Sequence, residues 1–240
     1  MTGARRRALL FVSLNLVVGA IFAIAAIQRN AGSLAPRPPS QRPTLLLLTS
    51  LPLVFGEDFS LEGGGSPALR GLESSYQVVP ISVTDRADLA KGELLLMAQP
   101  RAQTAENLVT LDEWVRSGGR VLLLADPMLE WPSKRPLGDP LRPSPMFADT
   151  GLLQHWGLRL DAPDRRGPAE RRLGSHQVAT TSPGTLHGAC AMTSDRLAAQ
   201  CSVGRGKATI VADADLLNVA KTDAPNLDAV LEELAMLESK

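Results

Sequence analysis

The sequence predicts an α/β protein in which a mostly parallel sheet has helices on both faces, a three-layer arrangement. Apolar runs of strand length recur along the chain, and several are apolar at every position, which is typical of parallel strands buried on both faces. Segments with helical apolar spacing separate some of these runs. The 240 residues include 20 glycines and 18 prolines but few aromatic residues. This composition indicates many turns and a core of leucine, valine and alanine.

The first 28 residues are expected to form a signal anchor, that is, a single transmembrane helix. Residues 8–27, "ALLFVSLNLVVGAIFAIAAI", carry no charge, and as a helix they would span about 30 Å, the thickness of a bilayer core. Three arginines, residues 5–7, precede this run and predict a cytoplasmic N-terminus. The alternative is a cleaved signal peptide, because "AIA" at 23–25 fits the small-x-small cleavage pattern. In both cases the remainder of the chain is exported.

Residues 29–43 are rich in proline and are expected to be a stiff linker, so the extracytoplasmic domain is predicted to span residues 44–240. The segment 44–55, "TLLLLTSLPLVF", begins as a strand that is apolar at successive positions. Further strands are predicted within "YQVVPISV" (76–83) and "GELLLMAQP" (92–100).

A strand-helix-strand unit follows. Thr104 can cap a helix whose apolar residues Leu108, Leu111 and Val115 recur at helical spacing, and the glycines at 118 and 119 end it. The next strand is "RVLLLADP" (120–127). This order predicts a right-handed crossover between parallel strands.

The second half of the domain has a less regular pattern. Five prolines in residues 131–147 predict an irregular loop, and Asp149 can cap a short helix over 150–156. One more strand is predicted in 158–163, successive strands joined by turns in 188–218, and a final amphipathic helix in 226–237.

Three stretches carry a resemblance to a known family: "GELLLMAQPRAQTAENLVTLDEWVRSGGRVLLLADP", "TGLLQHWGLRLD" and "GRGKATIVADADLLN". They resemble the soluble domain of the GldG-like family, the ABC-type uncharacterised transport system proteins. The resemblance implies a class I glutamine-amidotransferase-like fold. It also implies a periplasmic domain tied to the cell inner membrane, acting as an auxiliary component beside the membrane subunits of an ABC transporter.

The strand ends offer the main candidates for a functional site. An amidotransferase of this fold class needs a nucleophilic cysteine at a strand-to-helix turn, but after the strand at 120–124 the sequence has Asp126 followed by proline. Catalysis of that kind is therefore not expected. Asp126, Asp213, Asp215 and Asn218 all follow apolar strands, and could form a polar ligand pocket or a metal site where α/β sheets bind ligands. The alternative, which we favour, is that the aspartates cap turns, so no catalytic residue, metal or cofactor is expected.

Other polar motifs point to no specific chemistry. The three histidines, His155, His176 and His187, lack metal-ligand spacing. The arginine cluster in residues 165–172, "RRGPAERR", is expected to be a solvated loop. Because 25 basic residues balance 25 acidic ones, nucleic acid is not an expected partner.

The two cysteines, Cys190 and Cys201, are predicted to form a disulfide. If the strands on either side of "TSDR" pair as a hairpin, positions whose numbers sum to 391 face each other, and the two cysteines satisfy this sum. Directly opposed residues in an antiparallel pair lie close enough for a disulfide. The alternatives are two buried free thiols, or a register shifted by one residue that would send the sulfur atoms to opposite faces.

The sequence thus favours a membrane-anchored, non-catalytic binding or assembly module. The alternative is a hydrolase or carbohydrate-active enzyme that uses the strand-end carboxylates. An open pocket shared by Asp126 and Asp213 would favour the enzyme, and a dry, capped arrangement would favour the module.

Overall fold

The structure is a computed structural model that describes residues 35–55, 65–221 and 224–239. The anchor expected over residues 8–27 lies outside these ranges. Among the described residues, no helix combines the length and the apolar character needed to cross a membrane.

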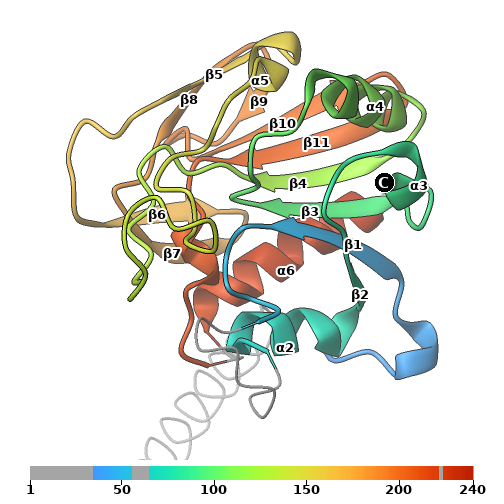
Figure 1. Ribbon diagram of the computed structural model, residues 1–240, viewed down its shortest axis with the longest axis horizontal. Coiled ribbons are helices and arrows are strands. Elements are labelled where there is room, and N and C mark those ends of the chain that lie inside the picture. The colour runs from blue at the N-terminus through green and yellow to red at the C-terminus, as the bar shows by residue number, and fades with distance from the viewer. Residues whose placement is uncertain (1–34, 56–64, 222–223, 240) are drawn as a thin grey trace, which may run out of the picture. The chain divides into compact units, whose positions relative to one another are not determined.

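The central feature is a seven-stranded sheet with the strand order β2-β1-β3-β4-β11-β10-β9 (Figure 1). The first five strands in this order run parallel to one another, β10 is antiparallel to β11, and β9 is antiparallel to β10. The α/β class with a mostly parallel sheet, predicted from the sequence, is therefore confirmed. The strands are β1 (Thr44–Thr49), β2 (Gln77–Pro80), β3 (Leu94–Ala98), β4 (Arg120–Leu124), β9 (Ala191–Met192), β10 (Ala198–Val203) and β11 (Gly206–Val211).

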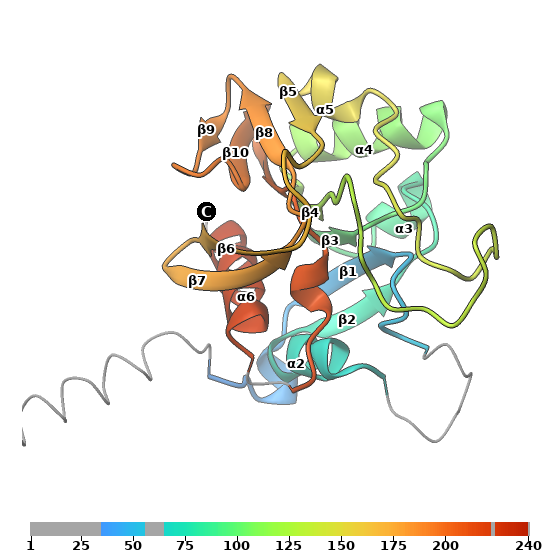
Figure 2. The same ribbon diagram turned by 90° about the vertical axis from the view of Figure 1, so that its left-hand side faces the viewer.

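Helices cover both faces of this sheet, as Figures 1 and 2 show. One face carries α2 (Pro67–Ser75) and α6 (Pro225–Glu238), and the other carries α3 (Arg86–Leu89) and α4 (Ala105–Arg116). Side chains that alternate along each strand enter two separate cores: Leu45 and Leu47 pack in one, and Leu46 and Leu48 in the other. This alternation explains why the parallel strands are apolar at every position.

Helix α4 follows the prediction closely. The Thr104 hydroxyl accepts the N–H of Asn107 at the N-cap, and Leu111 and Val115 are buried. The chain leaves the helix through Gly118, whose φ of 124° a side chain would disfavour. The predicted unit β3-α4-β4 therefore forms, with its two strands adjacent and parallel.

Shorter elements complete the second half. The predicted helix is α5 (Leu152–His155), but its N-cap is Gly151, and Asp149 instead accepts the Gly151 N–H in the turn before the helix. The predicted strand at 158–163 is β5 (Leu158–Asp161), which pairs with β8 (Thr185–Gly188). Residues 131–147 form an irregular loop, as expected.

The expectation of a solvated loop over residues 165–172 is wrong for its second half. Strand β6 (Pro168–Leu173) pairs with β7 (His176–Thr181) in a hairpin, with Gly174 at positive φ in the turn. Its buried side chains Leu173 and Val178 belong to the core beneath α6. Arg172 is exposed, whereas Arg171 is half-buried on the same face of the strand as Leu173. The charge of the two arginines obscured a strand that tertiary packing stabilises.

Part of the expected linker belongs to the folded domain. Residues Pro39–Gln41 form a 3₁₀ turn, η1, and the N–H of Arg37 donates to the Ser74 carbonyl. The Arg37 guanidinium lies 2.9 Å from Glu238 and 5.3 Å from the centre of the Tyr76 ring. The domain thus begins before Thr44, because this arginine has an ion-pair and a cation–π partner on the folded surface.

The two cysteines form a disulfide with a Cα–Cα distance of 4.9 Å. Strand β10 pairs with β9 through Gln200 opposite Ala191. This is the register predicted from the sequence, and it sets Cys201 opposite Cys190.

Candidate functional site at the carboxyl edge of the sheet

The three strand-end aspartates meet at the carboxyl edge of β4 and β11. These strands are parallel neighbours with Leu124 opposite Val211, so Asp126 and Asp213 leave the sheet side by side. Asp215 follows on the 3₁₀ turn η2 (Asp215–Leu217). One carboxylate oxygen from each of the three residues lies within 4.8 Å of the other two. The sequence therefore identified residues that do come together in space.

All three carboxyl groups are buried, and backbone N–H groups cap them. Asp126 and Asp213 are 0 % exposed and Asp215 is 9 % exposed. The two oxygens of Asp126 accept the N–H groups of Met128 at 2.8 Å and Ala214 at 3.2 Å. One oxygen of Asp213 accepts the Leu216 N–H at 3.2 Å. These contacts are those of turn-capping aspartates.

The fourth residue suggested by the sequence does not join this cluster. Asn218 is exposed at the end of η2, where its backbone N–H donates to the Asp215 carbonyl. The turn of η2 directs the chain out of the interior between residues 217 and 218. The candidate site therefore consists of the three aspartates without Asn218.

Gln99 is a buried polar residue that the sequence reasoning missed. It follows β3 directly, has a φ of 44°, and is 0 % exposed. Its side-chain oxygen accepts the Asp126 N–H at 2.9 Å, and its amide nitrogen donates to the carbonyls of Asp126 and Ser144, each at 3.1 Å. The sequence signal that could have identified it is a glutamine directly after a predicted strand and directly before Pro100. Gln99 ties the loop after β4 to the end of β3.

Burial dominates the electrostatics of the cluster. Loss of solvation raises the pKa of Asp126 to about 7, against the opposing effect of its backbone N–H donors. Burial, followed by the nearby charges of Asp126 and Asp215, raises the pKa of Asp213 well above its ordinary value. Burial also raises the pKa of Asp215 to about 6. The group therefore holds at least one proton near neutral pH.

The donors around the cluster leave little room for a cation. Asp213 Oδ2 and Asp215 Oδ1 are the cluster oxygens without a hydrogen-bond partner among the described residues. Calcium requires six to eight oxygen ligands and magnesium an octahedron of them. Two available oxygens fit a shared proton better than a metal ion.

The three histidines lie apart from this cluster and from one another. Each contacts a different carboxylate: His155 that of Asp112, His176 that of Glu232 and His187 that of Asp161. They do not form a joint metal site.

An open cleft of about 270 Å³ lies elsewhere on the same edge of the sheet. Strand β1 connects to β2 on one side, and β3 connects to β4 on the other, so the carboxyl ends of β1 and β3 form the topological switch point where such sheets bind ligands. The cleft lining contains none of the three aspartates. Its residues are Leu47, Thr49, Ser50, Leu51, Pro52, Val54, Phe55, Pro80, Ile81, Arg101, Arg135 and Leu141.

Two hydroxyl groups on the floor of this cleft are already engaged. Thr49 donates to the Ala98 carbonyl at 2.8 Å, and Ser50 donates to the Gln99 carbonyl at 2.5 Å. Among the described lining residues, neither hydroxyl group has a histidine or carboxylate beside it that could act as a general base.

Comparisons with known proteins define the fold class. No protein-family model and no curated protein matches the chain. Among solved structures, the N-terminal domain of mmIFT52 is similar with a TM-score of 0.53 and 13% identity, over 82% of this chain and 98% of that one. Gan42B, a GH42 beta-galactosidase from G. stearothermophilus, is similar with a TM-score of 0.50 and 15% identity.

These similarities concern the fold alone. The match to Gan42B covers 84% of this chain but only 30% of the galactosidase chain. At such identities the shared feature is a mostly parallel α/β sheet with flanking helices, and no residue role follows from it.

Proposed function

We propose that this protein is a non-catalytic binding or assembly module of the cell envelope. The observation that carries the proposal is the complete burial of Asp126 and Asp213, whose carboxyl groups cap backbone N–H groups. A carboxylate that is closed to solvent and bonded to its own turns cannot reach a substrate. The exposed cleft, by contrast, offers apolar and cationic side chains for binding.

The finer assignments rest on the sequence. We propose a glutamine-amidotransferase-like variant of the α/β fold, in which Asp126 and its following proline replace the nucleophile after β4. We also propose that residues 8–27 anchor the chain as a single pass in the inner membrane, with a cytoplasmic N-terminus and a periplasmic domain. The resemblance to the GldG-like family supports the membrane subunits of an ABC transporter as partners.

The second candidate is a hydrolase or carbohydrate-active enzyme. One observation favours it: the cluster holds carboxyl groups with raised pKa values, as catalytic acids do. This function would require the loops over the cluster to open, so that substrate could reach Asp126 and Asp213.

Complementation separates the two candidates. A deletion strain is complemented with the wild type, Asp126→Asn and Asp213→Asn, with the exposed substitution Asp149→Asn as a matched control. The module predicts full complementation by every variant whose melting temperature is unchanged. Loss of function by Asp126→Asn at an unchanged melting temperature would favour the enzyme.

Fractionation tests the anchor independently. The full-length protein is expected in the membrane fraction, with its C-terminus accessible to protease from the outside. A soluble product that begins near residue 26 or 27 would show instead that the N-terminal segment is a cleaved signal peptide.

A further inference from the structure

The exposed large apolar side chains concentrate at the carboxyl edge of the sheet. Phe55 (64 %), Leu137 (77 %), Leu141 (51 %) and Met146 (62 %) lie on the chain after β1 and on the loop after β4. In the part of the chain that the structure describes, the fifth such residue is Val109 on α4. Figures 1 and 2 both show the loop after β4 beside the chain that follows β1. Clustering of this kind marks an interaction surface.

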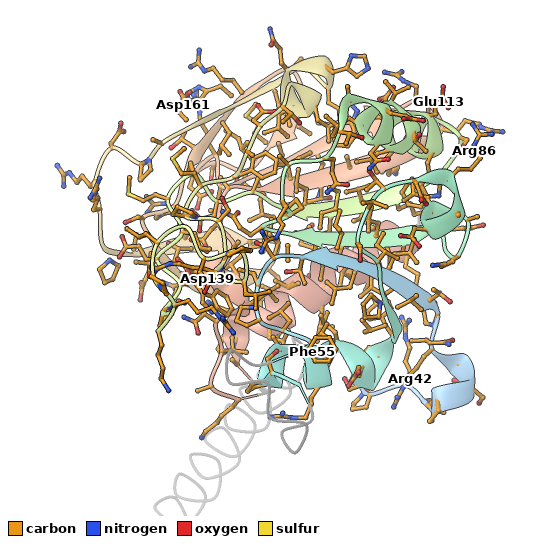
Figure 3. All side chains as sticks on the ribbon, viewed as in Figure 1. Arg42, Phe55, Arg86, Glu113, Asp139 and Asp161 are labelled. Carbon is orange, nitrogen blue, oxygen red and sulfur yellow. A yellow bond between two sulfur atoms is a disulfide. The ribbon has the colours of Figure 1, made fainter. Side chains whose placement is uncertain are left out.

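The cleft has walls too open for a small ligand. Phe55 and Leu141 both line it, yet more than half of each side chain stays exposed. Figure 3 labels Phe55 on the chain after β1 and Asp139 on the neighbouring loop. Small-molecule sites usually enclose most of the ligand surface. An aromatic residue at the rim of a shallow apolar cleft is instead typical of sites that receive side chains of a partner protein.

The charged side chains of the cleft indicate the charge of a partner that would bind there. Among the described residues, its lining contains Arg101 and Arg135 and no acidic side chain. Arg135 lies 3.5 Å from Asp139, whereas Arg101 donates to the Pro140 carbonyl and has no carboxylate within ion-pair distance among the described residues. An acidic side chain on a partner would complement Arg101.

The loops that carry these residues are held in place. Gln99 bonds the end of β3 to Asp126 and Ser144, and the Leu129 N–H donates to the Pro145 carbonyl. Thr49 is likewise bonded to the end of β3. Because these bonds fix the loops before binding, a partner would lose less free energy in ordering them. The capped aspartates thus serve binding indirectly, by supporting the loop after β4.

We propose that this edge, comprising Phe55, Arg101, Leu141 and their neighbours in the cleft, docks a segment of a partner protein in which acidic residues alternate with apolar ones. The inference rests on the proposed binding function and names its surface and partner chemistry. It is independent of the membrane anchor and of the identity of the transporter.

Peptide binding to the full-length protein tests the inference. The probe is a fluorescein-labelled peptide in which phenylalanine and leucine alternate with glutamate, and its comparison peptides carry lysine or glutamine in place of glutamate. Fluorescence anisotropy gives the affinities. We expect the glutamate peptide to bind about tenfold or more tightly than the lysine peptide.

Substitutions then locate the binding surface. Phe55→Ser with Leu141→Ser is expected to weaken binding about tenfold or more, and Arg101→Glu to abolish the preference for glutamate over lysine. The matched controls are Val109→Ser, on α4, and Arg205→Glu, on the turn before β11 at the opposite edge of the sheet. Both controls should bind as the wild type does.

Several outcomes would overturn the inference: equal binding of all three peptides, no binding, or equal loss in the test and control variants. Binding of hexanoate when none of the three peptides binds would assign the cleft to a small carboxylate instead. Because complementation by Asp126→Asn and membrane fractionation use other readouts, failure of the docking surface is distinguishable from failure of the proposed function.

Discussion

Replacing Asp213 by asparagine should make the protein more stable at neutral and alkaline pH. The asparagine side chain would keep an oxygen to accept the Leu216 N–H and would place an NH₂ group where Asp213 Oδ2 has no hydrogen-bond partner. This NH₂ group can donate to the carboxylates of Asp126 and Asp215. The substitution thus removes a buried group whose ionisation is unfavourable and keeps its bond to the Leu216 N–H.

The magnitude follows from the pKa of Asp126. This pKa is about 7 in the folded protein, against an ordinary value of 3.8. The folded protein keeps a proton that the unfolded chain releases, so stability is greatest below about pH 4 and falls as the pH rises to about 7. At about 1.4 kcal/mol per unit, this one group accounts for a fall of at most about 4 kcal/mol. Asp213 adds to this fall, because burial and the nearby charges raise its pKa well above its ordinary value. An asparagine does not titrate, so we expect the variant to lose less stability than the wild type between pH 4.5 and 8.

Urea unfolding, followed by circular dichroism between pH 4.5 and 8, measures how the free energy of unfolding depends on pH in the wild type and in the variant. Asp149→Asn, at an exposed turn, is the matched control and should leave the pH dependence unchanged. If Asp213→Asn were less stable than the wild type at pH 8, with the same pH dependence, the idea of a proton held by the buried cluster would be refuted.

Three further predictions concern local contacts. Replacing Cys190 and Cys201 together by alanine should lower the free energy of unfolding by at most about 3 kcal/mol, because the bridge closes a short loop, with a sequence separation of 11. Detection of two free thiols, after the wild-type protein is denatured without reductant, would contradict the bridge. Thr104→Ala should cost about 1 kcal/mol through loss of the α4 N-cap bond. Thr110→Ala, at a half-buried position inside α4, serves as its control in the same urea titration. Arg37→Ala should cost no more than about 1 kcal/mol, because its ion pair with Glu238 is partly exposed. Amide hydrogen exchange should become faster at Ser239 and in residues 35–43 of the variant. Unchanged exchange there would show that this contact does not hold the N-terminal segment to the domain.

Sequence reasoning was most successful where neighbouring residues carry the signal. The apolar runs at 45–48, 94–98 and 121–124 predict strands buried on both faces, and the structure has those strands. The register of β9 and β10 also followed from the spacing of the two cysteines. By contrast, the hairpin β6-β7 was missed, because its stability depends on α6, which is distant in the sequence.

Local sequence patterns were enough to predict the fold class, the order of the parallel strands along the chain, and three carboxyl groups at strand ends. The closure of these groups to solvent became evident from the folded structure alone. One Asp126 donor, the Met128 N–H, is local, but the other, the Ala214 N–H, lies 88 residues away. Hydrophobic periodicity depends on neighbouring residues, so one segment reveals it. Burial of a polar group depends on which distant segments pack over it and donate to it, and a local pattern does not encode that.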